Sequence, residues 1–398
     1  MKNKDLIDRF LRYVKIDTQS AEDAEGQPST AKQRNLAALL AEELRELGAE
    51  VDYDEEHCYV YAKLPGTEPA LGFIAHMDTS PEASGKDVKP RVFTYKGDDS
   101  LLSEDDFPEL AEHRGEELIA TDGTTLLGAD DKAGVAEIMN LVQYYAEHPK
   151  KAHRTICVAF TPDEEIGSGT LNFEPGRFTA EEAYTVDGGK FGILEYECFN
   201  AAAATVTFHG KNVHTGSAKG VMVNSMKLAM EYQSLLPAGE TPENTEGYEG
   251  FYHLDAMTGN VEETVLKYLV RDHDRQKFEN RKQFLQDAAQ FLNRKYGEGT
   301  VDIALRDQYY NMKEVMEEHM DLVENAGKII FHMGTNPVTT PIRGGTDGAM
   351  LSFRGIPCPN LSTGGYNYHG RYEYASIPEM EKSAEVLIRL VAAKEEEC

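Results

Sequence analysis

A chain of 398 residues, 40% hydrophobic and 27% charged, has the composition of a folded protein and is long enough for two domains. Its 69 acidic residues against 40 basic ones give a net charge of −29, which argues against nucleic acid or an anionic membrane as the main partner. The excess of carboxylates favours a soluble protein and supplies oxygen ligands of the kind that hard cations prefer.

Cysteine usage and the apolar segments bear on the cellular compartment. The cysteines are five and widely scattered: Cys58, Cys157, Cys198, Cys358 and Cys398. No pair has zinc-finger spacing, so we expect reduced thiols in a reducing compartment. Met1 is followed by polar residues rather than by a secretory signal, and no window approaches the roughly 20 apolar residues of a spanning helix. These features predict a cytoplasmic protein with neither a membrane nor a nucleic acid partner.

Helical and strand patterns alternate through the first half of the chain. Apolar residues recur with a helical period over residues 5–16 and 31–47, separated by a polar, turn-rich loop at residues 18–30. Short apolar runs predict strands at residues 51–64, 71–75, 155–160 and 183–186, and a further helix follows residue 134. Strands that alternate with helices indicate an α/β fold with a mainly parallel sheet flanked by helices.

Two stretches depart from this alternation. Residues 80–118 are rich in Gly, Pro, Asp and Glu, and we expect a long excursion there. Residues 200–312 read as a compact α+β insert of about four strands and two helices, after which the α/β pattern resumes and ends in a helix over residues 378–393. We therefore expect one domain from residues 1–199 and 313–398 and a smaller inserted domain from residues 200–312.

The turn that follows the strand at residues 155–160 carries the strongest chemical signal. It contains adjacent glutamates, Glu164 and Glu165, and adjacent residues at a strand end point in different directions. One carboxylate can therefore hold a metal ion while the other faces a substrate. Three other turns in similar settings also carry acid or histidine, at residues 76–78, 128–132 and 187–189. Because ligand sites in open α/β sheets lie at the carboxyl ends of strands, we expect these turns to meet.

Two hydrolytic metal ions about 3.5–4 Å apart need a bridging carboxylate and one or two further ligands each. We expect His76 and Asp187 to hold one ion, Glu165 and the late His369 to hold the other, and Asp130 to bridge them. Imidazole and carboxylate together suit zinc, with cobalt or manganese as possible substitutes.

Two acidic residues remain for other roles. Asp78, two residues past His76, is placed to fix the tautomer of a ligand imidazole. Glu164 is free to act as general base on the shared water and then as acid to the leaving amine. Taken singly, Asp130 could be a helix cap and Asp187 a turn former. A lone histidine near a strand end is usually a polar residue whose hydrogen bonds are made within the protein. The joint occurrence of these turns is what favours a metal centre.

A series of motifs makes the sequence similar to the peptidase T (aminotripeptidase) branch of the dinuclear-zinc exopeptidases, from the N-terminal helices to the last helix. The motifs are Ala75-His76-Met77-Asp78-Thr79, Leu127-Gly128-Ala129-Asp130-Asp131-Lys132-Ala133-Gly134, Thr161-Pro162-Asp163-Glu164-Glu165-Ile166-Gly167, Thr185-Val186-Asp187-Gly188-Gly189, Asn212-Val213-His214-Thr215-Gly216, Arg343-Gly344-Gly345-Thr346-Asp347-Gly348 and Tyr368-His369-Gly370. The resemblance implies the metal and base roles given above and a cis peptide between Asp130 and Asp131.

The same resemblance implies a zinc exopeptidase-like fold whose insert is a lid and homodimerisation domain. It implies an aminopeptidase that takes the N-terminal residue from short peptides, chiefly tripeptides, with two Zn²⁺ per subunit. His214 would stabilise the oxyanion, and its neighbour Thr215 stands where the family pattern has Pro, which leaves the imidazole unchanged. Arg271 and Arg343 would bind the free carboxylate of the peptide, and Asn200 would touch the substrate.

Other functions on the same scaffold stay open. A dipeptidase, a carboxypeptidase or an N-acyl amino acid deacylase would share this chemistry, because only the substrate pocket separates them. A non-catalytic peptide-binding protein with a structural metal is the alternative from another class. The uncoordinated Glu164 argues against it, since a structural metal site would be closed and would have no spare base.

Overall fold

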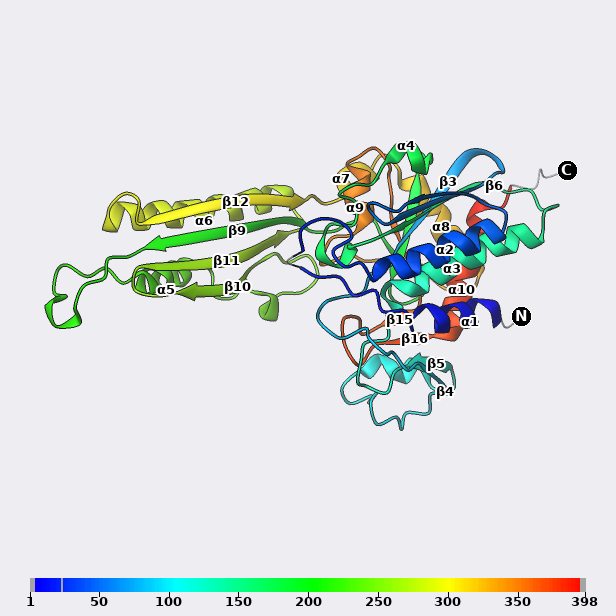
Figure 1. Ribbon diagram of the computed structural model, residues 1–398, viewed down its shortest axis with the longest axis horizontal. Helices are drawn as coiled ribbons and strands as arrows, with labels where there is room; N and C mark the ends of the chain where they lie inside the picture. The colour runs from blue at the N-terminus through cyan, green and yellow to red at the C-terminus, as the bar shows by residue number, and fades with distance from the viewer. Residues whose placement is uncertain (1–3, 23, 394–398) are drawn as a thin grey trace. The chain divides into compact units, whose positions relative to one another are not determined.

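The computed structural model describes residues 4–22 and 24–393, and Figure 1 labels many of its helices and strands. The chain divides into two compact units. Unit 1 consists of Met1–Tyr196, Val315–Thr340 and Thr346–Cys398; unit 2 consists of Glu197–Glu314 and Pro341–Gly345. The return of the chain to unit 2 at Pro341–Gly345 has no counterpart in the sequence analysis. The predicted domain boundaries themselves stay a prediction.

Unit 1 is built on an eight-stranded mixed sheet with the order β1-β2-β6-β3-β7-β14-β8-β13. The strands are β1 (Glu50–Asp54), β2 (Tyr59–Leu64), β3 (Thr67–His76), β6 (Arg154–Thr161), β7 (Ala183–Gly188), β8 (Ile193–Glu195), β13 (Val338–Thr339) and β14 (Asn360–Ser362). Its centre, β6-β3-β7-β14, is parallel. The single strand expected at residues 51–64 is instead the hairpin β1-β2, whose turn contains Cys58 at a positive φ of 68°.

Helices cover both faces of this sheet, as strands with near-continuous apolar runs require. Alternate residues of β7 show the two sides. The backbone oxygen of Val186 lies against Gly134 of α3 (Ala129–Glu147), and the Tyr184 hydroxyl donates to a carbonyl of α8 (Met320–His332). On the other side, Thr185 lies against Gly348 of α9 (Asp347–Ser352). The predicted fold class is confirmed.

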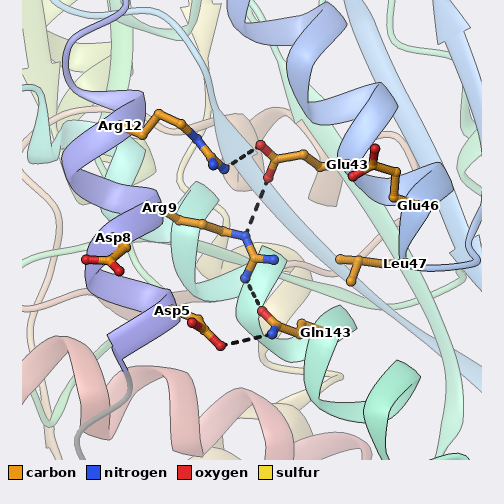
Figure 2. A pocket seen from close by; sticks show the side chains of 8 residues that line it. All are labelled: Asp5, Asp8, Arg9, Arg12, Glu43, Glu46, Leu47 and Gln143. Carbon is orange, nitrogen blue, oxygen red and sulfur yellow. Dashed lines mark hydrogen bonds and ion pairs between the residues drawn. The ribbon is translucent and has the colours of Figure 1, made fainter.

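The remaining helices of unit 1 are α1 (Lys4–Tyr13), α2 (Gln33–Glu46), α4 (Pro175–Phe178), α7 (Lys313–Met316), which spans the boundary between the units, and α10 (Ile377–Val391). Of these, α1 and α10 pack on α3, α2 packs on β1 and β2, and α4 packs on β2 and β6. A pocket of about 360 Å³ lies where α1, α2 and α3 meet, and Figure 2 shows the side chains that line it. In it Arg9 lies 3.5 Å from Glu43, both Arg9 and Arg12 pair with that carboxylate, and Asp5 accepts a 3.1 Å hydrogen bond from Gln143. The two arginines that line this pocket are therefore engaged in contacts between helices.

A second, smaller sheet of unit 1 has the order β15-β16-β5-β4. Its strands are β4 (Arg91–Thr94), β5 (Glu117–Ala120), β15 (Gly365–Tyr366) and β16 (Tyr374–Ser376). Buried side chains hold it together: Tyr95, Leu102, Leu110, Leu118, Ala120 and Tyr374. The excursion expected at residues 80–118 is therefore a folded substructure, and the hairpin β15-β16 that pairs with it carries His369.

Unit 2 is the α+β unit that the sequence predicts. An antiparallel sheet has the order β10-β11-β9-β12. Its strands are β9 (Asn200–His209), β10 (Phe251–Gly259), β11 (Glu263–Asp272) and β12 (Val301–Tyr309), and its long helices are α5 (Ser225–Leu235) and α6 (Arg275–Tyr296). Tyr232 of α5 packs on Phe208 and donates to the carbonyl of Leu285 in α6, so both helices lie on one face of the sheet. Thr205 of β9 is exposed on the other face.

Candidate metal centre and active site

The carboxyl ends of the central parallel strands gather the predicted ligands at one edge of the sheet in unit 1. His76 is the last residue of β3, and Asp187 is the penultimate residue of β7. β6 ends at Thr161, and the short 3₁₀ turn Glu164–Ile166 follows it. Asp130 comes from the amino end of α3, which packs on β3 and β7. Neighbouring strands and one helix therefore aim their side chains at a common point.

Asp130 lies between the two predicted histidine ligands. Its Oδ1 is 2.8 Å from Nε2 of His76, and its Oδ2 is 3.3 Å from Nε2 of His369. Asp187 Oδ1 lies 3.5 Å from the same nitrogen of His76. Glu165 Oε2 lies 2.9 Å from the same nitrogen of His369. The structure thus brings together all of the residues predicted as metal ligands, with one Asp130 oxygen on each side.

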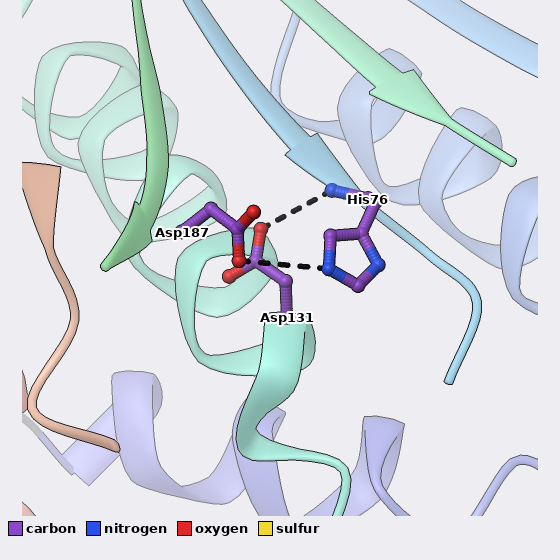
Figure 3. A group of neighbouring side chains, drawn as sticks. All are labelled: His76, Asp131 and Asp187. Carbon is purple, nitrogen blue, oxygen red and sulfur yellow. Dashed lines mark hydrogen bonds and ion pairs between the residues drawn. The ribbon is translucent and has the colours of Figure 1, made fainter. Parts of the chain in front are cut away.

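Asp131 joins this cluster, although the sequence analysis gave it no ligand role. Figure 3 shows it beside His76 and Asp187, and ligand atoms of these three residues lie within 4.8 Å of one another. Its Oδ2 accepts a 3.2 Å hydrogen bond from the backbone N–H of His76, and its Oδ1 accepts one from Gly134. Both oxygens therefore serve the backbone, which favours Asp130 over Asp131 as the shared ligand. The Asp130–Asp131 peptide is cis, as the resemblance implies.

Asp78 is fully buried and connects two parts of the cluster. Its Oδ1 accepts the backbone N–H of Glu164 at 3.0 Å, and its Oδ2 accepts that of Glu165 at 3.3 Å. The same Oδ1 lies 3.3 Å from Nδ1 of His76, whose other ring nitrogen faces Asp130. A carboxylate in this position holds the ring orientation of a ligand histidine.

Burial raises the pKa values of three carboxyl groups at this edge, whereas the pKa of Asp130, despite its burial, is held well below its ordinary value by hydrogen bonds to His369 and His76. Burial raises the pKa of Glu164 well above its ordinary value, that of Glu165 to about 8 and that of Asp187 to about 7. Each upward shift measures the cost of holding a negative charge away from water beside other negative charges. Cations bound among these groups would reverse that cost.

The histidines respond in the opposite sense. Burial lowers the pKa of His76, but the carboxylates of Asp187 and Asp130 raise it well above its ordinary value. Hydrogen bonds to Asp130 and Glu165 raise the pKa of His369 to about 11. Both rings thus lie where positive charge is favoured, which is the environment that a metal ion requires.

The donor set fits a metal. It combines imidazole nitrogens with carboxylate oxygens, the mixture that suits zinc and its first-row neighbours. Glu165 supports the fit, because its Oε1 is buried with no hydrogen-bond partner among residues 4–22 and 24–393. A buried oxygen left without a partner is costly unless a ligand or an ion satisfies it. The structure therefore contains a candidate metal site.

A segment far upstream braces the loops that carry this cluster. Asp163, at a left-handed φ of 55°, accepts hydrogen bonds from the backbone of Ser29 at 2.7 Å and from Gln33 Nε2 at 2.6 Å. Gln19 Nε2 donates at 2.9 Å to the carbonyl of Ala83 in the loop that follows Asp78. The polar loop expected at residues 18–30 is thus fixed to the turns on either side of the candidate metal site.

The other predicted site residues belong to unit 2, and two of them lie in its loops. His214 is exposed, and its Nδ1 accepts the backbone N–H of Gly216 at 3.1 Å. Arg343 donates from both terminal nitrogens to the segment 245–249, with a shortest distance of 2.7 Å to the carbonyl of Gly247. The guanidinium thus clamps a loop of its own unit.

The last two predicted residues lie on strands of unit 2. Arg271 of β11 donates to the carbonyls of Ala202 and Val270 at 3.3 and 3.1 Å. Asn200 is fully buried, donates to the carbonyls of Asp272 and His273 and accepts the backbone N–H of Asn311. This packing does not favour a substrate contact for Asn200, whose predicted role stays a prediction.

The sequence analysis missed Glu373. This buried residue accepts hydrogen bonds from the backbone N–H groups of Leu127, Gly128 and Asp130. A single glutamate, four residues past His369 and outside any periodic pattern, gives no signal in the sequence. Its partner segment is 243 residues away in the chain, so only the folded structure shows the contact.

The chain resembles known proteins over nearly its whole length. Residues 196–300 match the family described as a peptidase dimerisation domain. A peptidase T of Alkaliphilus oremlandii is 51% identical, over 98% of this chain and 98% of its own. A crystal structure of an aminopeptidase from Bacillus cereus has a TM-score of 0.76 at 24% identity, over 98% of this chain and 97% of its own. That of a tripeptidase from Staphylococcus aureus has a TM-score of 0.77 at 22% identity, over 97% of each chain.

The α/β unit with its cluster of histidines and carboxylates, joined to a dimerisation-type unit, defines a two-domain metallopeptidase. The 51% sequence identity to a peptidase T shows which family of metallopeptidases the chain belongs to. The chain belongs to the peptidase T family, and it is an enzyme that hydrolyses peptide bonds. No helix within the described ranges combines the length and apolarity needed to cross a bilayer.

Proposed function

We propose that the chain is a metal-dependent aminopeptidase that removes the N-terminal residue from short peptides, chiefly tripeptides. The observation that carries the proposal is Asp130, whose two carboxylate oxygens face two different histidines. One carboxylate shared in this way is what a pair of ions needs. Membership of the peptidase T family supports the choice of tripeptides, as does the fold shared with a protein named as a tripeptidase.

In this proposal His76 and Asp187 would hold one ion, Glu165 and His369 would hold the second, and Asp130 would serve both. The ions would be Zn²⁺, with Co²⁺ or Mn²⁺ as substitutes, because the ligands are imidazole and carboxylate. When bound, such a pair polarises the scissile carbonyl and makes the attacking water more acidic.

Glu164 supplies the proton transfers. Its carboxylate takes a proton from the attacking water and then delivers it to the nitrogen of the leaving amine. Burial raises the pKa of Glu164 above its ordinary value, the direction that suits a group that must both accept and release a proton. Asp78 fixes the position of the Glu164 backbone and the orientation of the His76 ring.

The roles of the unit 2 residues rest on the resemblance. His214 would stabilise the oxyanion, and Arg271 and Arg343 would bind the terminal carboxylate of the peptide. The match to a peptidase dimerisation domain supports a homodimer. A cytoplasmic location is supported by the buried free thiols of the described cysteines: Cys58, Cys157, Cys198 and Cys358.

The adjacent glutamates give a matched pair of variants. Glu164→Gln is expected to lower kcat by about 10²- to 10⁴-fold while two ions stay bound, because only the base is removed. Glu165→Gln is expected to lose metal, because it removes a ligand. Release of the N-terminal residue from a tripeptide and elemental analysis give the two readouts. Full activity in Glu164→Gln would remove the base assignment.

Blocked substrates separate the remaining functions on this scaffold. An aminopeptidase cleaves a tripeptide with a free amine and leaves its N-acetylated form intact. Hydrolysis of the acetylated form would favour a deacylase, and release of the C-terminal residue first would favour a carboxypeptidase. Metal-dependent release of any amino acid excludes a non-catalytic binding protein.

A further inference from the structure

Glu373 lies in unit 1 between the turn that carries His369 and strand β16. Its side chain is 1% exposed, and both of its oxygens are engaged by backbone N–H groups. Oε2 accepts from Leu127 at 2.7 Å and from Gly128 at 2.8 Å, and Oε1 accepts from Asp130 at 3.0 Å. A single buried carboxyl group thus accepts hydrogen bonds from three backbone N–H groups of the segment that contains Asp130.

The segment that Glu373 holds has no regular structure of its own. Gly128 adopts a left-handed φ of 81°, and Asp130 and Asp131 have non-helical backbone angles within α3. The first N–H groups of a helix also lack partners inside the helix. The orientation of Asp130 therefore depends on an acceptor from outside, and the acceptor that the structure shows is Glu373.

The same residue belongs to the turn that presents His369. The backbone N–H of Glu373 donates to the carbonyl of Gly370 at 3.3 Å, which closes the turn between β15 and β16. His369 has a positive φ of 64°, so its ring direction depends on how this turn is held. Glu373 therefore ties the turn of His369 to the turn of Asp130, whose side chains lie 3.3 Å apart.

We propose that Glu373 is a positioning residue of the metal centre, one that sets the separation and orientation of Asp130 and His369. This inference rests on the proposed function, in which these two residues share an ion. A buried carboxyl group that accepts three backbone hydrogen bonds is well suited to this, because each bond fixes one backbone direction. Residues that hold metal ligands in this way typically change metal affinity about 10- to 100-fold when they are replaced.

The test compares Glu373→Gln with a matched control, Glu137→Gln. Both glutamates are buried, and Glu137 lies in α3 itself, but neither of its oxygens has a hydrogen-bond partner among residues 4–22 and 24–393. The amide that Glu373→Gln introduces would turn its NH₂ group toward backbone N–H groups that now donate to an oxygen. The metal-free proteins are titrated with Zn²⁺ against a chromophoric chelator, and kcat and KM for a tripeptide are measured in parallel.

The expected result is a loss of about 10- to 100-fold in Zn²⁺ affinity for Glu373→Gln and no loss for Glu137→Gln. The kcat of Glu373→Gln falls at limiting Zn²⁺ and recovers in excess Zn²⁺, while KM stays close to that of the wild type. Wild-type affinity for both ions in folded Glu373→Gln overturns the inference, even if its melting temperature falls, because a cap of α3 alone would affect only stability.

Two further outcomes are separated in the same experiment. If the wild type itself fails to bind two ions, the proposed function fails, whatever the variant does. If Glu373→Gln does not fold, Glu373→Asp takes its place, since it keeps the charge and shortens the side chain by one methylene. An affinity loss in that variant supports the inference, and wild-type affinity overturns it.

Discussion

The carboxylate of Asp78 accepts a hydrogen bond of 3.0 Å from the backbone N–H of Glu164. It also accepts the N–H of Glu165 and lies 3.3 Å from Nδ1 of His76. The proposed base, a proposed ligand of one ion and a proposed ligand of the other are therefore held by a single buried side chain. Movement of Asp78 would displace all three together.

Replacement of Asp78 by Asn is expected to reduce kcat about 10- to 100-fold. The amide keeps one acceptor, but its NH₂ group must face either the Glu164 or the Glu165 backbone, which displaces the turn. Steady-state kinetics on a tripeptide, with metal content measured on the same sample, check the result. Asp122→Asn is the control, because Asp122 is partly exposed and its side chain accepts from Thr124 within its own turn. Equal kcat in the two variants would contradict the role given to Asp78.

Removal of metal is expected to lower the melting temperature. An ion that binds only the folded state stabilises it by about 2.7 kcal/mol at 100 times its Kd. Its loss would also leave the carboxylates of Glu165 and Asp187 crowded in a buried site. Calorimetry before and after dialysis against EDTA measures the change, and readdition of Zn²⁺ should restore the first value. Asp130→Ala serves as the control, since EDTA should shift its melting temperature far less.

Glu137→Gln is expected to stabilise the protein increasingly as the pH rises. Burial raises the pKa of Glu137 well above its ordinary 4.5. Above about pH 4.5 the unfolded chain loses a proton that the folded state keeps, so wild-type stability falls by about 1.4 kcal/mol per pH unit until the folded pKa is reached. The glutamine variant has no such proton. Its gain should therefore be small near pH 5 and larger near pH 8.

Urea unfolding at several pH values measures this gain for Glu137→Gln. Glu298→Gln, a replacement at an exposed position, is measured in parallel as the control. Parallel stability curves for Glu137→Gln and the wild type would show that the buried carboxyl does not retain its proton.

Arg343→Lys is expected to raise KM about 10-fold or more for tripeptides with a free carboxylate, and much less for C-terminal amides. A lysine cannot supply the paired donors of the guanidinium, and a hydrogen bond to a charged group contributes about 1.5–3 kcal/mol. Kinetics with both substrates measure the difference. If Arg343 only clamps the loop at residues 245–249, both substrates should be affected equally, and that loop should become easier to cleave with a protease.

How far the sequence predicts the site depends on where each residue lies. His76, Asp130, Glu165 and Asp187 could be chosen because each follows an apolar strand or begins a helix, and such positions converge in a parallel sheet. The placement of His369 depends on the β15-β16 hairpin and its pairing with β5. Those strands are too short to leave a period in the sequence.

Other features left no local signal at all. Tyr95, Leu102, Leu110 and Leu118 form a core, yet their irregular spacing in a polar stretch suggested a plain excursion. Glu373 acts on backbone N–H groups 243 residues away. Burial and long-range hydrogen bonding of this kind arise only when the whole chain has folded, so no local motif or periodicity in the sequence predicts them.

The bond between Ser29 and Asp163 has a practical consequence for handling the enzyme. A single nick by a protease in the polar stretch between Gln19 and Gln33 would cut no ligand and no catalytic group. It would nevertheless weaken one anchor of the turn that bears Glu164 and Glu165, the hydrogen bond from Ser29 to Asp163. Nicked preparations should therefore lose activity while the two fragments stay associated. For this reason, an intact band on a denaturing gel is a better indicator of active enzyme than the elution volume in size-exclusion chromatography.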